Sequence, residues 1–327
     1  MTNLVPILTT PPQTLPQPHD KTTAFGVFRG CVPALSTRHW DQKWRIRYFK
    51  RKAWIFVGIH TADYLLGFAI ADAGYVGTAF AYCYDIRNNQ YWEEKITRPW
   101  AFAAKFDPDL KTNWKLSAWN IQVSANNSLA ANFLGKKIAL TITIPDIGSG
   151  VSTIARAFPN PFHFTWKNML LPATVELQTP IEKRILEGHF ASIDFSKGYP
   201  PSRTFWNWAS CTGSTQFQRE IAINLVADFN NGLENVIWLG ENLYSVGQAI
   251  FEYHKPPVKN KWHIHTLDNI LSIDFQPLGA RKEHIHLGLI KSQFTQPFGA
   301  FSGKIQLGGS QDFFTGFGVT EEHLAVW

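Results

Sequence analysis

The chain has 327 residues, of which 45% are hydrophobic, 14% aromatic and only 17% charged, and this composition suits about two globular domains of ~150 residues each. Its three cysteines are far apart and form no C-x-x-C pair, so neither a disulfide framework nor a cysteine-rich zinc site is expected, and a reducing compartment is favoured. The net charge of +6 allows contact with anionic surfaces but does not indicate one.

The first 24 residues are rich in proline, threonine and glutamine, which predicts an extended tail or arm. This segment lacks the basic region and the long apolar core of a signal peptide, and no stretch of the chain approaches the ~18 apolar residues of a membrane span. We therefore expect a cytoplasmic protein whose globular part begins near Phe25.

Basic residues are dense only in the segment Lys43–Lys52, which reads KWRIRYFKRK. We interpret it as a strand and turn whose basic side chains face water. The alternative is a patch for anionic lipid headgroups or nucleic acid. We retain transient contact with an anionic membrane as an expected interaction and do not expect nucleic-acid binding.

Apolar and polar residues alternate with a period of two in many segments, which is typical of half-buried antiparallel strands. The clearest case is Lys136–Pro145. Similar segments are residues 53–60, 118–125, 220–228, 262–266, 271–275 and 285–290. Helical periodicity is scarce, with a short helical turn considered only near Pro180–Glu187.

Short strands without a βαβ rhythm predict an all-β protein. We expect two antiparallel β-barrel or sandwich domains packed together, an N-terminal one at residues 25–185 and a C-terminal one at 186–327. A weak repeat of the pattern Trp-x-Ile at Trp119 and Trp262 is compatible with two related units and leaves a duplication open.

Two H-x-H pairs, His263/His265 and His284/His286, could each place two imidazoles on one face of a strand. The positions considered for a third ligand, Asn269 and Ile270 after the first pair and Ile290 and Lys291 after the second, are not carboxylates. We interpret both as polar strand edges and expect no metal site. Phosphate-binding glycine motifs and the G-x-S-x-G elbow are absent, so no cofactor is expected.

Tryptophans in the C-terminal half lie beside acidic residues. Trp206 and Trp208 share one face of a predicted strand, and Glu321 and His323 share one face of the last strand. Apolar walls with a few acids suit a cavity that binds or protonates an oily small molecule. A tryptophan-rich core pinned by structural carboxylates explains the same residues. The expected catalytic residues are Glu321, Glu234 and His323, and the expected ligand-binding residues are Trp206, Trp208, Asn235, Trp238, Phe275 and Asp194.

Four ordered motifs, IDFSKGYPPSRTFWNWAS, INLVADFNNGLENVIW, SQFTQPFGAFSGKI and GVTEEHLAVW, resemble the domain-of-unknown-function 2804 family. KWRIRYF, Ala62-Asp63-Tyr64 and FHFTWKNMLLPATVEL extend the resemblance into the N-terminal half, so that it covers Phe25–Trp327. One departure is Leu324, where the family pattern has an aromatic residue. The resemblance implies no assigned activity. It does imply an architecture like that of two-barrel, lipocalin-like (calycin) proteins, among them carotenoid hydratases and tocopherol cyclase.

The leading hypothesis is a protein that binds a hydrophobic small molecule in the C-terminal domain or where the two domains meet. If it is an enzyme, we expect a cofactor-free hydratase, cyclase or isomerase in which Glu321 or Glu234 protonates an alkene. The alternatives are a non-catalytic lipid carrier and a membrane-surface adaptor that uses Lys43–Lys52. The sequence leaves the ligand and the oligomeric state open.

Overall fold

The computed structural model describes residues 6–18, 25–43, 46–99, 104–106, 113–124, 126–287 and 290–327. The chain divides into two compact units. The N-terminal unit consists of Leu8–Ile59 and Leu66–Pro200, and the C-terminal unit of Met1–Ile7, His60–Leu65 and Pro201–Trp327. The boundary expected from the sequence, at residues 185/186, falls inside a strand, whereas the units divide between two consecutive prolines.

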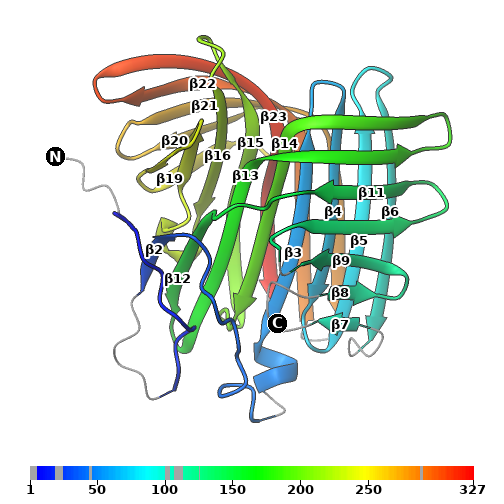
Figure 1. The fold of residues 1–327 in the computed structure, drawn as a ribbon, viewed down its shortest axis with the longest axis vertical. Helices are drawn as coiled ribbons and strands as arrows, with labels where there is room; N and C mark the ends of the chain where they lie inside the picture. Colours follow the sequence, from blue (N-terminus) through cyan, green and yellow to red (C-terminus); the bar gives the residue numbers. More distant parts are fainter. Residues whose placement is uncertain are drawn as a thin grey trace. The chain divides into compact units, whose positions relative to one another are not determined.

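The N-terminal unit is formed mainly by a 14-stranded sheet (Figure 1). In order of pairing, its main path is β6 (Gln90–Pro99), β5 (Val76–Asp85), β4 (Tyr64–Asp72), β3 (Lys52–His60), β14 (Lys183–Gly198), β13 (Asn160–Gln178), β11 (Ala139–Ile144), β10 (Leu129–Leu134), β9 (Trp119–Val123), β8 (Asn113–Leu116) and β7 (Ala104–Phe106). Off this path, β12 (Val151–Ala157) pairs with β13 and with β2 (Gly26–Arg29), and β2 pairs with β1 (Ile7–Leu8).

The C-terminal unit contains a nine-stranded sheet (Figure 1). In order of pairing, its strands are β18 (Asn242–Ser245), β17 (Val236–Leu239), β16 (Glu220–Ala227), β15 (Arg203–Thr215), β23 (Ser310–Val326), β22 (Ile290–Leu307), β21 (Leu271–Leu287), β20 (Trp262–Thr266) and β19 (Ala249–Tyr253). A single turn of 3-10 helix, η2 (Asn230–Gly232), lies between β16 and β17. The expectation of an all-β protein is confirmed.

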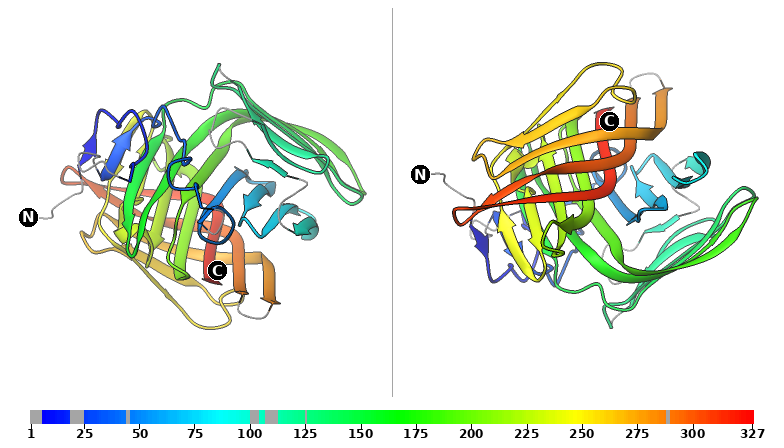
Figure 2. Two further views of the ribbon diagram at one scale, coloured as in Figure 1. Left: turned by 90° about the horizontal axis from the view of Figure 1, so that it is seen from below. Right: turned by 90° about the horizontal axis from the view of Figure 1, so that it is seen from above.

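Bulges interrupt the long strand pairs of both sheets. The register of β13 against β14 shifts between Asn168 and Pro172, and this hairpin curves along its length (Figure 2). The register of β21 against β22 shifts between Pro277 and Gly279. An extra residue in one strand bends it and strengthens its twist, which helps these sheets to curl.

The predicted strands are present, with two differences. The segments 271–275 and 285–290 are not separate strands; β21 runs without a break from Leu271 to Leu287, and β22 begins at Ile290. The helical turn considered near residues 180–187 is wrong, because β14 begins at Lys183 directly after the turn that follows β13. No helix in the described ranges is long and apolar enough to cross a membrane.

The basic segment Lys43–Lys52 differs from the predicted strand and turn. Ile46–Lys50 forms a π-helix, η1, and the two basic residues after it are buried. Arg51 forms ion pairs of 3.0 Å with both Asp41 and Asp72, and the Lys52 ammonium donates to the carbonyls of Phe49 and Ala73. Trp44 and Arg45 lie outside the described residues.

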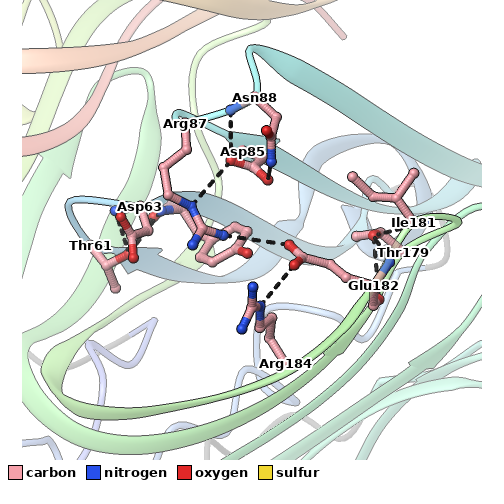
Figure 3. Close-up of polar contacts among 10 residues, drawn as sticks. Thr61, Asp63, Asp85, Arg87, Asn88, Thr179, Ile181, Glu182 and Arg184 are labelled. Carbon is pink, nitrogen blue, oxygen red and sulfur yellow. Dashed lines mark hydrogen bonds and ion pairs between the residues drawn. The ribbon is translucent and has the colours of Figure 1, made fainter.

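Charged side chains also connect two turns of the N-terminal unit (Figure 3). Glu182, in the turn between β13 and β14, accepts a hydrogen bond of 2.8 Å from Arg184 and lies 3.5 Å from Arg87 Nη2. Arg87 Nε is in turn 3.7 Å from Asp85, at the turn between β5 and β6. These contacts are partly exposed, so each contributes little to stability.

The hydrophobic core of the C-terminal unit lies on one face of its sheet. On β15 the core residues are Ala209 and Cys211. The pairing of β15 with β23 runs from Arg203 to Thr215 without a register shift, so side chains alternate strictly between the two faces. Trp206 and Trp208 therefore lie on the face opposite the core.

Candidate functional site

Eight side chains form two rows on the face of the nine-stranded sheet that is opposite its core. They come from the neighbouring strands β15, β23, β22 and β21. The first row is Trp206, His323, Phe294 and Glu283, and the second row is Trp208, Glu321, Gln296 and Arg281. We call this arrangement the Glu321 face.

The Glu321 carboxylate is the centre of the second row and is only 6% exposed. Its Oε1 accepts a hydrogen bond of 2.8 Å from the indole Nε1 of Trp206, and its Oε2 accepts one of 3.0 Å from the amide of Gln296. Burial favours the protonated form of a carboxyl group, whereas donated hydrogen bonds favour the charged form. Because both oxygens accept N–H bonds, the geometry suits a carboxylate.

His323 lies beside this carboxylate and is neutral at ordinary pH. Burial lowers the pKa of His323 to about 3; the negative Glu283 opposes this shift and the positive Arg281 adds to it. Nε2 of the imidazole is 2.9 Å from the Ser292 hydroxyl, and Nδ1 is 3.7 Å from Glu321 Oε1. The ring centroid of His323 is 4.3 Å from that of Trp206, so the imidazole is held by ring contact as well.

A buried guanidinium completes the polar part of the face. Arg281 is 1% exposed, and its Nη2 lies 2.5 Å from Glu283. Its Cζ is 5.0 Å from the centroid of the Phe294 ring, within the range of a cation–π contact. Arg281 thus pairs with one carboxylate and packs on one of the aromatic rings of the first row.

The two rows differ in exposure. All four residues of the first row are half-buried, whereas all four of the second row are buried. Within the part of the chain that the structure describes, the buried atoms of the face that have no hydrogen-bond partner include Gln296 Oε1 and His323 Nδ1. A half-buried, mainly aromatic row therefore borders a buried, mainly polar row, and each of the two rows has an atom with spare hydrogen-bonding capacity.

Five of the predicted site residues belong to this face of the sheet. Trp206, Glu321 and His323 are in direct contact. Trp208 donates its indole N–H to the Asn224 side chain at 2.8 Å. Trp238 lies on the same face of the sheet as Asn224, because it pairs with Ala222, which is two residues from Asn224 on β16. The tryptophan–acid cluster predicted from the sequence is thus present on one surface, although its role as a site stays a prediction.

Glu234 and Asn235 have structural contacts in the loop between η2 and β17. The Glu234 carboxylate is bonded to the side-chain amide of Asn230. The Asn235 side chain accepts from the Val226 amide at 2.7 Å and donates to the Gly247 carbonyl at 2.9 Å. Asn235 is fully buried and satisfies backbone groups of two separate segments, which is the role of a loop anchor.

Phe275 and Asp194 lie away from the Glu321 face. Phe275 is in the hydrophobic core on the opposite side of the sheet, with its ring centroid 4.6 Å from that of Phe301. Asp194 belongs to β14 of the N-terminal unit and forms an ion pair with Lys167 on β13. Its closeness in sequence to Trp206 is misleading, because the chain passes from one sheet to the other between them.

Sequence reasoning missed the residues that β21 and β22 contribute, namely Arg281, Glu283, Phe294 and Gln296. Within each strand the two residues are two positions apart, and this spacing indicates that they share one face of the sheet. Which strands pair with β23, and in which register, is a long-range property that no local pattern reveals.

The comparisons with known proteins agree with this architecture. The family model described as "Domain of unknown function (DUF2804)" matches residues 7–327. The chain belongs to this family. No match was found among curated proteins.

Several solved structures resemble this DUF2804 member. Kievitone hydratase from Nectria haematococca has 10% identity and a TM-score of 0.59, with 97% of this chain and 98% of that chain covered. An AttH-like protein from Nitrosomonas europaea has 14% identity and a TM-score of 0.55, with coverages of 84% and 92%. CghA with Sch210972 has 12% identity and a TM-score of 0.51, with coverages of 84% and 88%. At these identities the likeness concerns the fold alone, and it confirms the expected two-barrel, lipocalin-like class.

Proposed function

We propose that this DUF2804 member binds a hydrophobic small molecule at the Glu321 face. The observation behind the proposal is the step in exposure between the two rows, from the half-buried rings of Trp206 and Phe294 to the buried carboxylate of Glu321. Aromatic rings supply most of the binding area for apolar ligands, while a few placed polar groups fix orientation. Gln296 Oε1 and His323 Nδ1 would bond a polar group at one end of the ligand.

The chemistry that this arrangement supports best is proton transfer without a cofactor, as in a hydration, cyclisation or isomerisation. Glu321 accepts two N–H bonds, so we assign it the role of proton acceptor first and proton donor second. In a hydration it would take a proton from water as the oxygen adds to a polarised double bond, and would return a proton to the neighbouring carbon. One protein of similar fold is named a hydratase, which is compatible with this chemistry.

The test is to identify what the protein retains from a total organic-soluble cell extract. Protein is incubated with the extract and re-isolated by gel filtration, and bound compounds are identified by mass spectrometry. Wild type is compared with Glu321→Gln and with Glu322→Gln, a matched control on the same strand whose side chain bonds Tyr253 and Lys255 on the other face. We expect an apolar compound with wild type and with the control, and a loss of any turnover by about 100-fold or more in Glu321→Gln. Failure to enrich any apolar compound over an unrelated protein would overturn the proposal.

A non-catalytic carrier is the second candidate. It is favoured by the fact that both Glu321 oxygens are already bonded within the protein, as in a structural network. A carrier predicts that Glu321→Gln and Glu234→Gln retain the bound compound unchanged and that no conversion occurs.

Attachment to an anionic membrane through Lys43–Lys52 has less support. Arg51 and Lys52 are buried in contacts with the protein itself, so they do not add to a surface charge. Lys43 and Lys50 are exposed, and binding to anionic vesicles through these two cations would fall steeply with salt.

A further inference from the structure

A second cluster of polar side chains lies at the edge of the nine-stranded sheet, on β19, β20 and β21. Glu252 on β19 pairs with His263 on β20, which pairs in turn with Asp274 on β21. His265, two residues further along β20, points to the same face. That face is opposite the core, since the alternate residues Trp262 and Ile264 are core residues.

The geometry of three of these side chains suits one metal ion. Glu252, His263 and His265 each offer a ligand atom, and these atoms lie within 4.8 Å of one another. Zinc bonds of about 2.0–2.2 Å place tetrahedral ligand atoms about 3.4 Å apart. Glu252 and His263 are exposed, so their side chains can close this difference by rotation without disturbing the core.

We propose that Glu252, His263 and His265 form a binding site for a divalent transition metal ion such as Zn²⁺. Two imidazoles and one carboxylate match the ligand preferences of Zn²⁺, Ni²⁺ and Cu²⁺, whereas Mg²⁺ and Ca²⁺ require oxygen ligands. Three protein ligands leave one tetrahedral position for water or for a ligand from solution.

Two further observations support the site. Nδ1 of His263 is 3.0 Å from Asp274 Oδ1, which leaves Nε2 to bind the metal while the carboxylate fixes the ring, as in other histidine metal ligands. Nδ1 of His265 is buried, and among the residues that the structure describes it has no hydrogen-bond partner. An imidazole nitrogen that is shielded from water gains most from a ligand.

The spacing within the H-x-H pair does not reveal this site, because the carboxylate ligand comes from another strand, before the pair in the chain. In an antiparallel hairpin the residue opposite the first histidine precedes it in the chain, and here it is Glu252. The other pair, His284 and His286, has no such neighbour: these residues pair with Gln293 and Lys291, an amide and a cation. His284 and His286 therefore serve as a control pair for metal binding, because they have the same H-x-H spacing but no carboxylate opposite them.

Because Glu252 and the two histidines come from adjacent strands, a bound metal would join the edge strand β19 to β20. A ligand that binds only the folded chain raises its stability. Metal binding is therefore expected to raise Tm as well as to give a calorimetric signal.

The experiment titrates untagged, chelator-treated full-length protein with Zn²⁺ and, separately, with Mg²⁺, by isothermal calorimetry. All proteins have the background substitution Cys31→Ser, so that this half-buried thiol does not compete. We expect about one Zn²⁺ per chain and no Mg²⁺ binding. His263→Ala/His265→Ala should abolish binding, Asp274→Asn should weaken it about 10-fold, and His284→Ala/His286→Ala should leave it unchanged.

Thermal unfolding with and without Zn²⁺ supplies the second measurement. Zn²⁺ should raise Tm of the background protein and of His284→Ala/His286→Ala, but not of His263→Ala/His265→Ala. The proposal is overturned if the background protein binds no Zn²⁺, or if His263→Ala/His265→Ala binds it as tightly as the background protein does.

Discussion

The indole N–H of Trp206 donates to the carboxylate of Glu321 across 2.8 Å, although the two residues are 115 positions apart in the chain. The strands that contain them, β15 and β23, are neighbours, and Trp206 reaches diagonally to Glu321 because its direct partner is His323. This bond ties an aromatic ring of the half-buried row to the acid of the buried row. It also makes the Glu321 face testable without knowledge of the ligand.

The first prediction is a coupling energy between these two residues. Trp206→Phe keeps an apolar ring and removes the donor, and Glu321→Gln removes the charged acceptor. A hydrogen bond to a charged group contributes about 1.5–3 kcal/mol, so the double variant should be less destabilised than the sum of the singles by about 1–2 kcal/mol. The measurement is the free energy of unfolding in urea for all four proteins.

The matched control for this cycle is Trp238→Phe combined with Glu321→Gln. Trp238 is on the same face, but β16 and β15 lie between β17 and β23. Effects of such distant residues add to within about 0.5 kcal/mol. Equal coupling energies in the two cycles would contradict a specific Trp206–Glu321 bond.

The face of each strand could be predicted from the sequence where alternation is unbroken. The pairs Trp206 with Trp208 and Glu321 with His323 were placed correctly because β15 and β23 pair without a register shift. The position of Phe275 was not predicted correctly, because the alternation of side chains does not indicate which face of the sheet packs into the core. The bulge between Pro277 and Gly279 adds to this difficulty, since it puts Phe275 and Arg281 on opposite faces although they are an even number of residues apart.

Strand pairing is the second feature of the fold that could not be predicted from the sequence. Gln296 and Arg281 lie in the same row as Glu321 because β22 and β21 follow β23 in the order of the sheet, and Glu252 lies opposite His263 because β19 pairs with β20. The first arrangement depends on contacts between segments distant in sequence, and the second depends on the direction of a hairpin. Asp194 shows the reverse case, in which nearness in sequence to Trp206 did not mean nearness in space.

The second prediction separates Asn235 from the ligand-binding residues. Asn235→Ala removes bonds to the Val226 amide and the Gly247 carbonyl and leaves both backbone groups buried. Leaving such groups unsatisfied costs about 1–3 kcal/mol each, so we expect a clear drop in the free energy of unfolding. The folded fraction should still retain the same compound from cell extract as wild type. A normal stability combined with loss of the compound would instead return Asn235 to the binding site.

The third prediction contrasts two ion pairs of the N-terminal unit. Arg51→Met leaves the buried carboxylate of Asp72 and the half-buried carboxylate of Asp41 without their guanidinium, and breaking a buried pair costs about 3–5 kcal/mol. Arg87→Met removes a side chain that is 40% exposed, at distances of 3.5 and 3.7 Å from its partners, and should cost less than about 1 kcal/mol. Urea unfolding of both variants measures the difference. Similar losses would mean that the Arg51 network is as hydrated as the surface pair.

The last prediction concerns pH. Burial lowers the pKa of His60 to about 4 and those of His163 and His323 to about 3, with Lys167 contributing at His163. Each of these imidazoles is neutral in the folded protein, whereas in the unfolded chain it takes up a proton below about pH 6.5. The unfolded state then binds more protons. The stability they contribute is fully present above pH 6.5 and is lost as the pH falls from 6.5 toward 3–4.

Each of these histidines adds up to about 1.4 kcal/mol per pH unit to the slope of the free energy of unfolding against pH, once its unfolded form is protonated. His163→Phe should reduce the slope between pH 5 and 6.5 relative to wild type. The measurement is urea unfolding at several pH values in this window. A slope that His163→Phe does not reduce would mean that the His163 imidazole can be protonated in the folded protein.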